Sequence, residues 1–173
     1  MEQILIKGLA KDDALVLQKL AEATFRETYT DKNSPEDMQL YIETNFSEVQ
    51  LTTELQNRNS YFFMAMAGST PVGYIKLNTG TAQTEPKSED YLELERIYVS
   101  QTYQGNKVGQ LLLAHAENIA RTQGRQFIWL GVWEENLKAI GFYEKNGFVP
   151  FDTHIFKLGK DEQTDILMRK KIK

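Results

Sequence analysis

The polar turn Gln104–Gly109, with the sequence QGNKVG, is the segment of this chain best suited to binding a charged ligand. It lies between an apolar strand pattern and a long helical pattern. At such a junction, backbone N–H groups converge on one point, and the positive end of the helix dipole favours an anion there. The turn lacks both the Walker A pattern and the dinucleotide pattern Gly-x-Gly-x-x-Gly. We therefore expect an anion-binding turn that differs from those two motifs.

Side chains on either side of the turn could move protons. Downstream, Asn136, Ala139 and Tyr143 lie at i, i+3 and i+7 of a helical pattern, so they share one face. Upstream, Glu93 and Glu95 lie within a strand pattern. A tyrosine hydroxyl can donate a proton and a carboxylate can accept one. The alternative interpretations are a core aromatic residue for Tyr143 and solvent-facing strand carboxylates for the two glutamates.

Taken in order, these segments resemble the GCN5-related N-acetyltransferase (GNAT) superfamily over most of the chain. Gln104 and Gly109 fit its pyrophosphate loop, Gln/Arg-x-x-Gly-x-Gly/Ala, whereas Lys107 stands where the first glycine is expected. A lysine can still donate its backbone N–H there, and its ammonium could meet a phosphate directly. The run Asn136-x-x-Ala-x-x-Phe-Tyr-x-x-x-Gly-Phe148 matches the second signature of the superfamily.

The resemblance implies that acetyl-CoA is the cosubstrate. In the superfamily, backbone groups of the strand before the turn pair with the pantetheine arm and polarise the thioester carbonyl, and the turn holds the pyrophosphate. The residues that this implies for acetyl-CoA binding are Ile97, Tyr98, Val99, Gln104, Gly105, Asn106, Lys107, Val108, Gly109, Asn136 and Tyr143.

The resemblance also implies direct transfer of the acetyl group to a primary amine. An alkyl amine has a pKa near 10.4, so it must lose a proton before it attacks. Glu93 aligns with the catalytic glutamate position, four residues before Ile97. Glu95, or a carboxylate acting through a water relay, is the alternative base. Tyr143 is the natural proton donor for the leaving thiolate.

Composition narrows the possible ligands and partners. The 173 residues include no cysteine and two histidines, so thiolate zinc sites and a cysteine nucleophile are excluded and no metal is expected. A net charge of −4 and a pI near 5.3 argue against nucleic acid. No apolar stretch approaches the roughly 18 to 20 residues of a membrane span, and the N-terminus lacks a signal-peptide pattern. We expect a cytoplasmic protein with a small-molecule amine substrate, as a monomer or a homodimer.

The segment between Ala21 and Gln56 concentrates negative charge, with eight acids against two bases and a net charge of −6. These acids either lie on the solvated faces of two helices or attract a cationic substrate. The runs Trp129–Asn136 and Gln163–Asp165 resemble the bacterial PaiA-type acetyltransferases of spermidine and spermine. A polyamine is therefore the expected acceptor. Alternatives are a peptide N-terminus, a protein lysine or an aminoglycoside, and a non-catalytic acyl-CoA sensor.

The pattern of apolar residues predicts an α+β protein with a mixed sheet. The resemblance implies the GNAT-type three-layer fold, a mostly antiparallel central sheet of about seven strands flanked by helices, in a single domain over residues 1–173. Strands are expected at 3–7, 61–66, 71–77, 91–99, 127–133, 149–158 and 164–172, and helices at about 13–29, 35–46, 49–55, 108–123 and 137–146.

The strand 91–99 contains an irregularity. Leu92 and Leu94 are apolar on one phase, whereas Ile97 and Val99 are apolar on the other. One extra residue at 95–96, a β-bulge, would bring all four to one face, and a strand buried on both faces is the alternative.

Two histidines and two tryptophans need an interpretation. The helical pattern after the turn predicts an apolar stripe along one face. We expect His115, which lies on this stripe, to be a core histidine whose polar atoms have hydrogen-bond partners. His154 is a minor candidate for substrate contact, and Trp129 and Trp133 are most simply core and strand-end residues. The stripe contains Val108, Leu111, Leu112, His115, Ala116 and Ile119.

Overall fold

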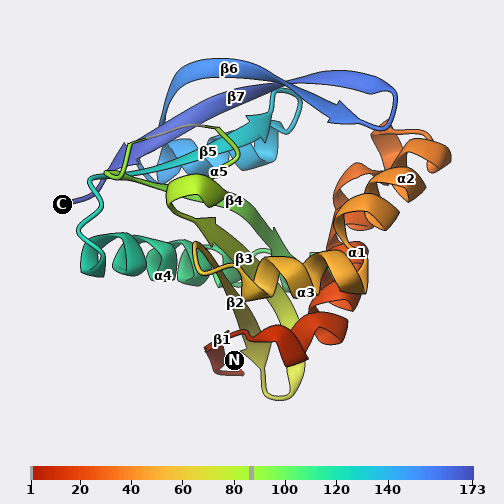
Figure 1. Ribbon diagram of the computed structural model, residues 1–173, viewed down its shortest axis with the longest axis horizontal. Coiled ribbons are helices and arrows are strands. Elements are labelled where there is room, and N and C mark those ends of the chain that lie inside the picture. The colour runs from red at the N-terminus through yellow and green to blue at the C-terminus, as the bar shows by residue number, and fades with distance from the viewer. Residues whose placement is uncertain (1, 86–87) are drawn as a thin grey trace.

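A computed structural model describes residues 2–85 and 88–173 (Figure 1). In the part described, seven strands form one sheet in the order β1-β2-β3-β4-β5-β7-β6. The neighbours β4 and β5 are parallel, and the other neighbouring pairs are antiparallel. The strands are β1 (Ile4–Gly8), β2 (Ser60–Ala67), β3 (Thr70–Asn78), β4 (Tyr91–Val99), β5 (Phe127–Trp133), β6 (Val149–Leu158) and β7 (Asp161–Lys171).

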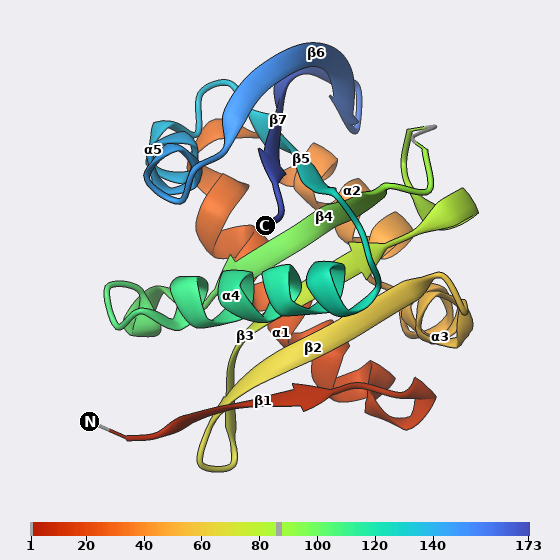
Figure 2. The ribbon, with the colours of Figure 1, turned by 90° about the vertical axis from the view of Figure 1, so that its left-hand side faces the viewer.

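Helices cover both faces of the sheet, which gives the three-layer α+β fold. One core joins the sheet to α4 and α5 through residues such as Leu112 and Tyr143, and a second core joins it to α1, α2 and α3 through Phe25 and Leu51. Figure 2 shows α4 in front of the sheet and α1 behind it. The helices are α1 (Ala14–Tyr29), α2 (Pro35–Asn45), α3 (Glu48–Gln56), α4 (Val108–Thr122) and α5 (Leu137–Lys145).

Side-chain caps explain where α2 and α5 begin. The Ser34 hydroxyl accepts from the N–H of Asp37 at 3.1 Å, and Pro35 takes the first helical position, where a missing N–H costs nothing. Asn136 caps α5 by accepting from the N–H of Ala139 at 3.2 Å. These starts confirm the predictions made from the sequence.

The predicted bulge lies at Glu95. Lys76 of β3 pairs with Arg96 of β4, but the next residue, Leu77, pairs with Leu94, so Glu95 is the extra residue. As a result the apolar residues at 92, 94, 97 and 99 all reach the core under α4. The bulge prediction is confirmed.

Beyond the bulge, β4 and β5 separate. Among the described residues these strands pair only over Tyr91–Glu93 and Phe127–Trp129. The remaining halves diverge, because the bulge redirects β4. The gap between the two diverging strands opens into the cavity described below.

Two details of α4 differ from the sequence prediction. Leu111 is 44% exposed, and Leu113 is buried in its place, because the apolar stripe lies further round the helix. His115 packs edge-on against Phe63, with ring centroids 4.3 Å apart, but its Nε2 is buried and has no hydrogen-bond partner among the described residues. The expectation of a satisfied histidine was therefore wrong.

No helix in the described ranges is long and apolar enough to cross a membrane.

Candidate active site

A cavity of about 670 Å³ opens where β4 and β5 separate. Its walls come from the diverging halves of both strands, from α1 and from the first turns of α4 and α5. Ten of the eleven residues expected to bind acetyl-CoA line it, as do Glu93 and Glu95. Asn106 is the exception, and its N–H donates weakly to the Tyr103 carbonyl at 3.4 Å. The volume suits a small-molecule site.

The turn before α4 presents backbone donors to one end of this cavity. The first N–H groups of a helix have no acceptor within the helix, so those of Val108 and Gly109 are available to a ligand. Gln104 is fixed beside them, because its Nε2 donates to the Val99 carbonyl at 3.1 Å. Lys138 of α5 adds an ammonium, which donates to the Gln104 Oε1 at 2.5 Å. This end fits a phosphate-bearing ligand.

Lys107 has the backbone conformation of a glycine. Its φ of 62° makes it the one non-glycine residue with positive φ in the described part of the chain. That left-handed conformation is strained for any residue with a Cβ, which explains why the superfamily pattern expects glycine at this position. The chain therefore keeps the loop geometry and adds an ammonium at the cavity wall.

The segment Ile97–Val99 of β4 runs along the cavity. One edge of it pairs with Gly73–Ile75 of β3. Its other edge faces the diverging half of β5, so an extended ligand can pair with the strand there, as peptides do at an exposed sheet edge.

Tyr143 of α5 lines the cavity and is 7% exposed. Its ring contacts Phe142 and Phe148, with centroids 5.5 and 5.7 Å away. Burial, followed by the nearby Tyr29, raises the pKa of the Tyr143 phenol. The hydroxyl is therefore protonated at neutral pH and can act as a donor. Phe142 also closes against Gly109, where a Cβ would come within 3.4 Å of its ring.

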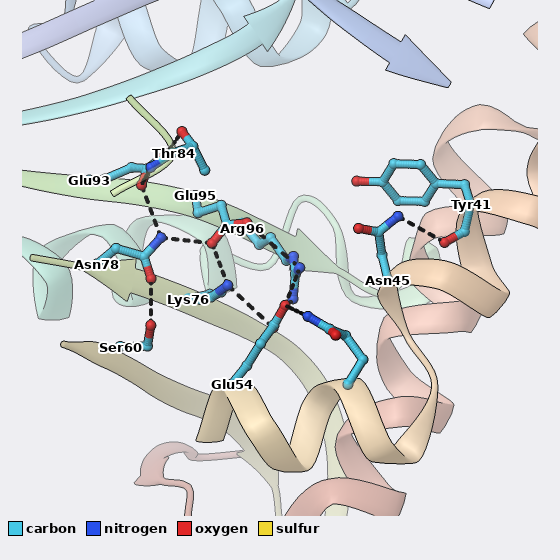
Figure 3. A network of polar contacts seen from close by, with 11 residues as sticks. Tyr41, Asn45, Glu54, Ser60, Lys76, Asn78, Thr84, Glu93, Glu95 and Arg96 are labelled. Carbon is cyan, nitrogen blue, oxygen red and sulfur yellow. Dashed lines mark hydrogen bonds and ion pairs between the residues drawn. The ribbon is translucent and has the colours of Figure 1, made fainter. Parts of the chain in front are cut away.

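Glu93 is buried, 3% exposed, where β4 still pairs with β5. Its carboxylate accepts from the Nδ2 of Asn78 at 2.9 Å, from the N–H of Thr84 at 2.9 Å and from the Thr84 hydroxyl (Figure 3). Burial raises the pKa of Glu93, although these hydrogen bonds oppose the rise. No cation lies within ion-pair distance of it in the part of the chain that the structure describes.

Glu95 lies in a different electrostatic setting, a compact group of four charges with Lys76, Arg96 and Glu54. Lys76 donates to Glu95 at 2.5 Å and lies 3.2 Å from Glu54, which also binds Arg96 at 2.8 Å (Figure 3). Burial alone would raise the pKa of Glu95, but Arg96 and Lys76 outweigh it and lower that pKa. Glu95 is therefore held as an ion.

Aromatic rings enclose the end of the cavity that faces α1 and α2. Phe25 and Tyr41 stack with centroids 4.5 Å apart, and Tyr29 lies 5.9 Å from Trp133. These rings and Tyr98 line the cavity together. Aromatic faces attract ammonium groups.

Carboxylates flank these rings. Asp165 of β7 lies opposite His154 of β6, and both line the cavity. His154 Nε2 is 3.7 Å from Asp165 and its Nδ1 is 2.7 Å from Glu85. Burial raises the pKa of Asp165 to about 6, against the opposing effect of His154. Gly131 makes room for this pair, since a Cβ there would lie 3.1 Å from an Asp165 oxygen.

The acidic segment 21–56 divides into acids at the cavity and acids away from it. Glu27 lines the cavity and accepts from the N–H of Gln101 at 2.9 Å, which ties α1 to the turn before α4. Glu22 pairs with Arg26, and Glu43 accepts from Gln39, outside the cavity. Glu54 belongs to the buried charged group.

Several residues of the site did not emerge from the sequence. Asn78, Thr84, Lys76 and Lys138 belong to no motif, and Asp165 appeared only within a run. A signal did exist for one of them, because Lys76 interrupts the otherwise apolar strand pattern 71–77. A polar residue in such a strand must find a buried partner.

The sequence and fold of the chain can be compared with those of known proteins. The family model described as the acetyltransferase (GNAT) family matches residues 16–148. An uncharacterised N-acetyltransferase from the pepI 3′ region of Lactobacillus delbrueckii subsp. lactis is 35% identical over 170 residues, 98% of each chain. The spermidine N(1)-acetyltransferase of Thermoplasma acidophilum is 30% identical over 170 residues, 96% of each chain.

Solved structures give the same relationship. The crystal structure of the PaiA N-acetyltransferase from Thermoplasma acidophilum in complex with coenzyme A superposes with a TM-score of 0.81 at 29% identity, covering 98% of this chain and 99% of that chain. The ribosomal-protein-S18-alanine N-acetyltransferase of Escherichia coli shares the fold, with a TM-score of 0.73 at 19% identity over 98% of this chain and 94% of the other.

Proposed function

The chain belongs to the GNAT family of acetyltransferases, and we propose that it moves the acetyl group of acetyl-CoA directly to a primary amine of a polyamine such as spermidine or spermine. Its activity is that of an N-acetyltransferase with acetyl-CoA as cosubstrate. The acceptor and the roles of individual residues are the proposed part.

The residues of the cavity fit acetyl-CoA. The N–H groups from Gln104 to Gly109 would bind the pyrophosphate, with Lys107 and Lys138 beside it, and the β4 edge at Ile97–Val99 would pair with the pantetheine amides. Asn136 and Tyr143 would lie on the opposite side.

We assign Glu93 as the proton acceptor, directly or through one water. A base must be ionised and yet hold a proton well enough to take it, which favours a raised pKa. Glu93 meets this requirement, whereas Glu95 is committed to Lys76 and Arg96. Donors from the described residues occupy three of the roughly four acceptor positions of the Glu93 carboxylate, and a water or an amine could take the fourth.

Tyr143 is the proposed acid. As the amine nitrogen bonds to the carbonyl carbon and the carbon–sulfur bond breaks, its hydroxyl gives a proton to the leaving thiolate. The proton that the amine loses passes to Glu93 and then to solvent, and a proton from solvent restores the Tyr143 hydroxyl after transfer. The buried phenol, with its raised pKa, remains a donor throughout the neutral range.

One observation carries the choice of acceptor: aromatic rings and the carboxylates of Glu27 and Asp165 line the same cavity. A polyamine carries several ammonium groups along an apolar chain. The carboxylates and the ring faces attract the ammonium groups, and the rings can contact the apolar chain between them. The similarity to the spermidine N(1)-acetyltransferase supports the same acceptor.

An amine panel tests this proposal. With acetyl-CoA fixed, kcat/KM would be measured for spermidine, spermine, a monoamine, a lysine peptide, a peptide N-terminus and an aminoglycoside, with products identified by mass spectrometry. We expect the polyamines to exceed the monoamine by about tenfold, the equivalent of one additional ion pair. A peptide or aminoglycoside as the best substrate would replace the polyamine proposal.

A further inference from the structure

A single amide connects the two carboxylates of the site. Asn78, the last residue of β3, donates to Glu93 at 2.9 Å and to Glu95 at 2.7 Å (Figure 3). Its Oδ1 accepts from the Ser60 hydroxyl at 2.9 Å. Asn78 is 0% exposed, so these contacts are shielded from solvent.

The orientation of this amide is determined by its partners. An ionised carboxylate only accepts hydrogen bonds, so both hydrogens of Nδ2 must point at Glu93 and Glu95. The oxygen then faces Ser60, which can donate. The sheet register reinforces the placement, because Asn78 pairs directly with Glu93 and the bulge turns Glu95 to the same amide.

The two carboxylates differ in charge balance. Glu95 and Glu54 are matched by Lys76 and Arg96, so these four charges form a neutral group. Glu93 is the additional negative charge, and the donors that hold it within the described residues, Asn78 and Thr84, are neutral.

We propose that Asn78 is a positioning residue for acetyl transfer, which fixes the Glu93 carboxylate against the neutral group and holds it in the ionised form that accepts the proton of the amine. This inference rests on Glu93 being the base of the proposed reaction. Asn78 acts through Glu93 and is not itself required to touch the substrate.

Other charged groups face this pair from the surrounding elements. On β5, Trp129 pairs with Glu93 in register and carries no charge. The remaining titratable groups nearby are Lys76 on β3, Arg96 and Glu95 on β4, Glu54 on α3, Glu85 after Thr84, His154 on β6 and Asp165 on β7.

A hydrogen bond to a carboxylate favours its ionised form, so the loss of the Asn78 donor must raise the pKa of Glu93. Glu93 would then be protonated at a higher pH. The acid limb of the kcat–pH profile should move upward, while the plateau at high pH should be largely retained.

The variant Asn78→Ala tests this. We expect the acid limb of kcat to move upward by about one pH unit, and kcat below the limb to fall about tenfold. The KM for acetyl-CoA should change by less than about twofold. Asn45→Ala is the matched control: Asn45 donates to the Tyr41 carbonyl at 3.0 Å, away from both carboxylates, so its loss should lower Tm without moving the limb.

The failure of this inference can be separated from that of the proposed base. Glu93→Gln should abolish the acid limb. If it does so while Asn78→Ala folds and leaves the limb in place, the positioning role is wrong and Glu93 remains the base. If Glu93→Gln keeps the limb, both assignments fail. Should Asn78→Ala not fold, Asn78→Ser, which keeps one donor, should still move the limb upward, and an unmoved limb there overturns the inference equally.

Discussion

The two ends of the cavity are constructed differently. The anion end comes from consecutive residues, Gln104–Gly109, whose backbone conformation and helix start supply the donors. The proposed acceptor end depends on side chains of separate elements. The ion pair behind Glu95 joins Glu54 and Arg96, which are 42 positions apart, and the hydrogen bond to Glu93 comes from Asn78, 15 positions away. Backbone sites tolerate changes of side chain, whereas side-chain networks do not, and the following predictions test that difference.

The largest effect is expected at Tyr143, the proposed proton donor. Tyr143→Phe keeps the ring and its packing but removes the proton donor, so kcat should fall by roughly 10²–10⁴ while the KM for acetyl-CoA changes little. Steady-state kinetics measure both. Tyr91→Phe is the control, because the Tyr91 hydroxyl accepts from Arg169 outside the cavity. An unchanged kcat in Tyr143→Phe would return Tyr143 to a packing role.

Asp165 tests the acceptor end next. Asp165→Asn removes a carboxylate from the cavity, so kcat/KM for spermidine should fall about tenfold, whereas acetyl-CoA affinity should not change. Because the pKa of Asp165 is about 6, its charge is present above that pH and lost below it. Spermidine kcat/KM should therefore decline in the wild type as pH falls through about 6, and this component should be absent in the variant.

The exposed Asp152 on β6 gives the matched control. Asp152→Asn makes the same change of charge outside the cavity and should leave spermidine kinetics intact. Equal losses in both variants would indicate a general effect of net charge.

The sequence predicts the anion end far better than the acceptor end, and the reason is physical. The turn, the helix start after Asn136 and the bulge at 95–96 depend on neighbouring residues, so local patterns reveal them. The neutral group around Glu95 depends on α3 packing against β3 and β4, which no local spacing encodes. The prediction that Leu111 lies on the buried stripe is wrong for a related reason, because tertiary packing sets the rotation of α4 over the sheet.

A smaller effect separates Glu27 from the other acids of segment 21–56. Glu27→Gln keeps an oxygen for the Gln101 N–H but removes the charge at the cavity, so the KM for spermidine should rise about fivefold. Glu43→Gln should change nothing, because Glu43 lies outside.

Added salt should weaken the use of spermidine in the same direction as Glu27→Gln, because it screens the same charge. At physiological ionic strength, screening limits exposed charges to a reach of about 8 Å, so spermidine kcat/KM should fall as salt increases. If spermidine kcat/KM does not change with salt and the KM does not change in Glu27→Gln, the acids of segment 21–56 lie on ordinary solvated helix faces.

The smallest effect is expected at Lys107. Lys107→Gly should change the acetyl-CoA Kd by less than about fivefold, because an exposed ammonium adds at most about 1 kcal/mol to a backbone site. Glycine also relieves the left-handed strain, so Tm should not fall. Lys107→Ala is the control that removes the ammonium and keeps the strain. A large loss of affinity in both variants would mean that the side chain, rather than the backbone, holds the phosphate.

The most direct test is a crystal structure with coenzyme A and spermidine bound together. The account predicts the pyrophosphate on the N–H groups of Gln104–Gly109, and a spermidine ammonium within about 4 Å of the Glu27 or Asp165 carboxylate. Coenzyme A bound away from the turn, or spermidine bound outside the aromatic end of the cavity, would contradict it.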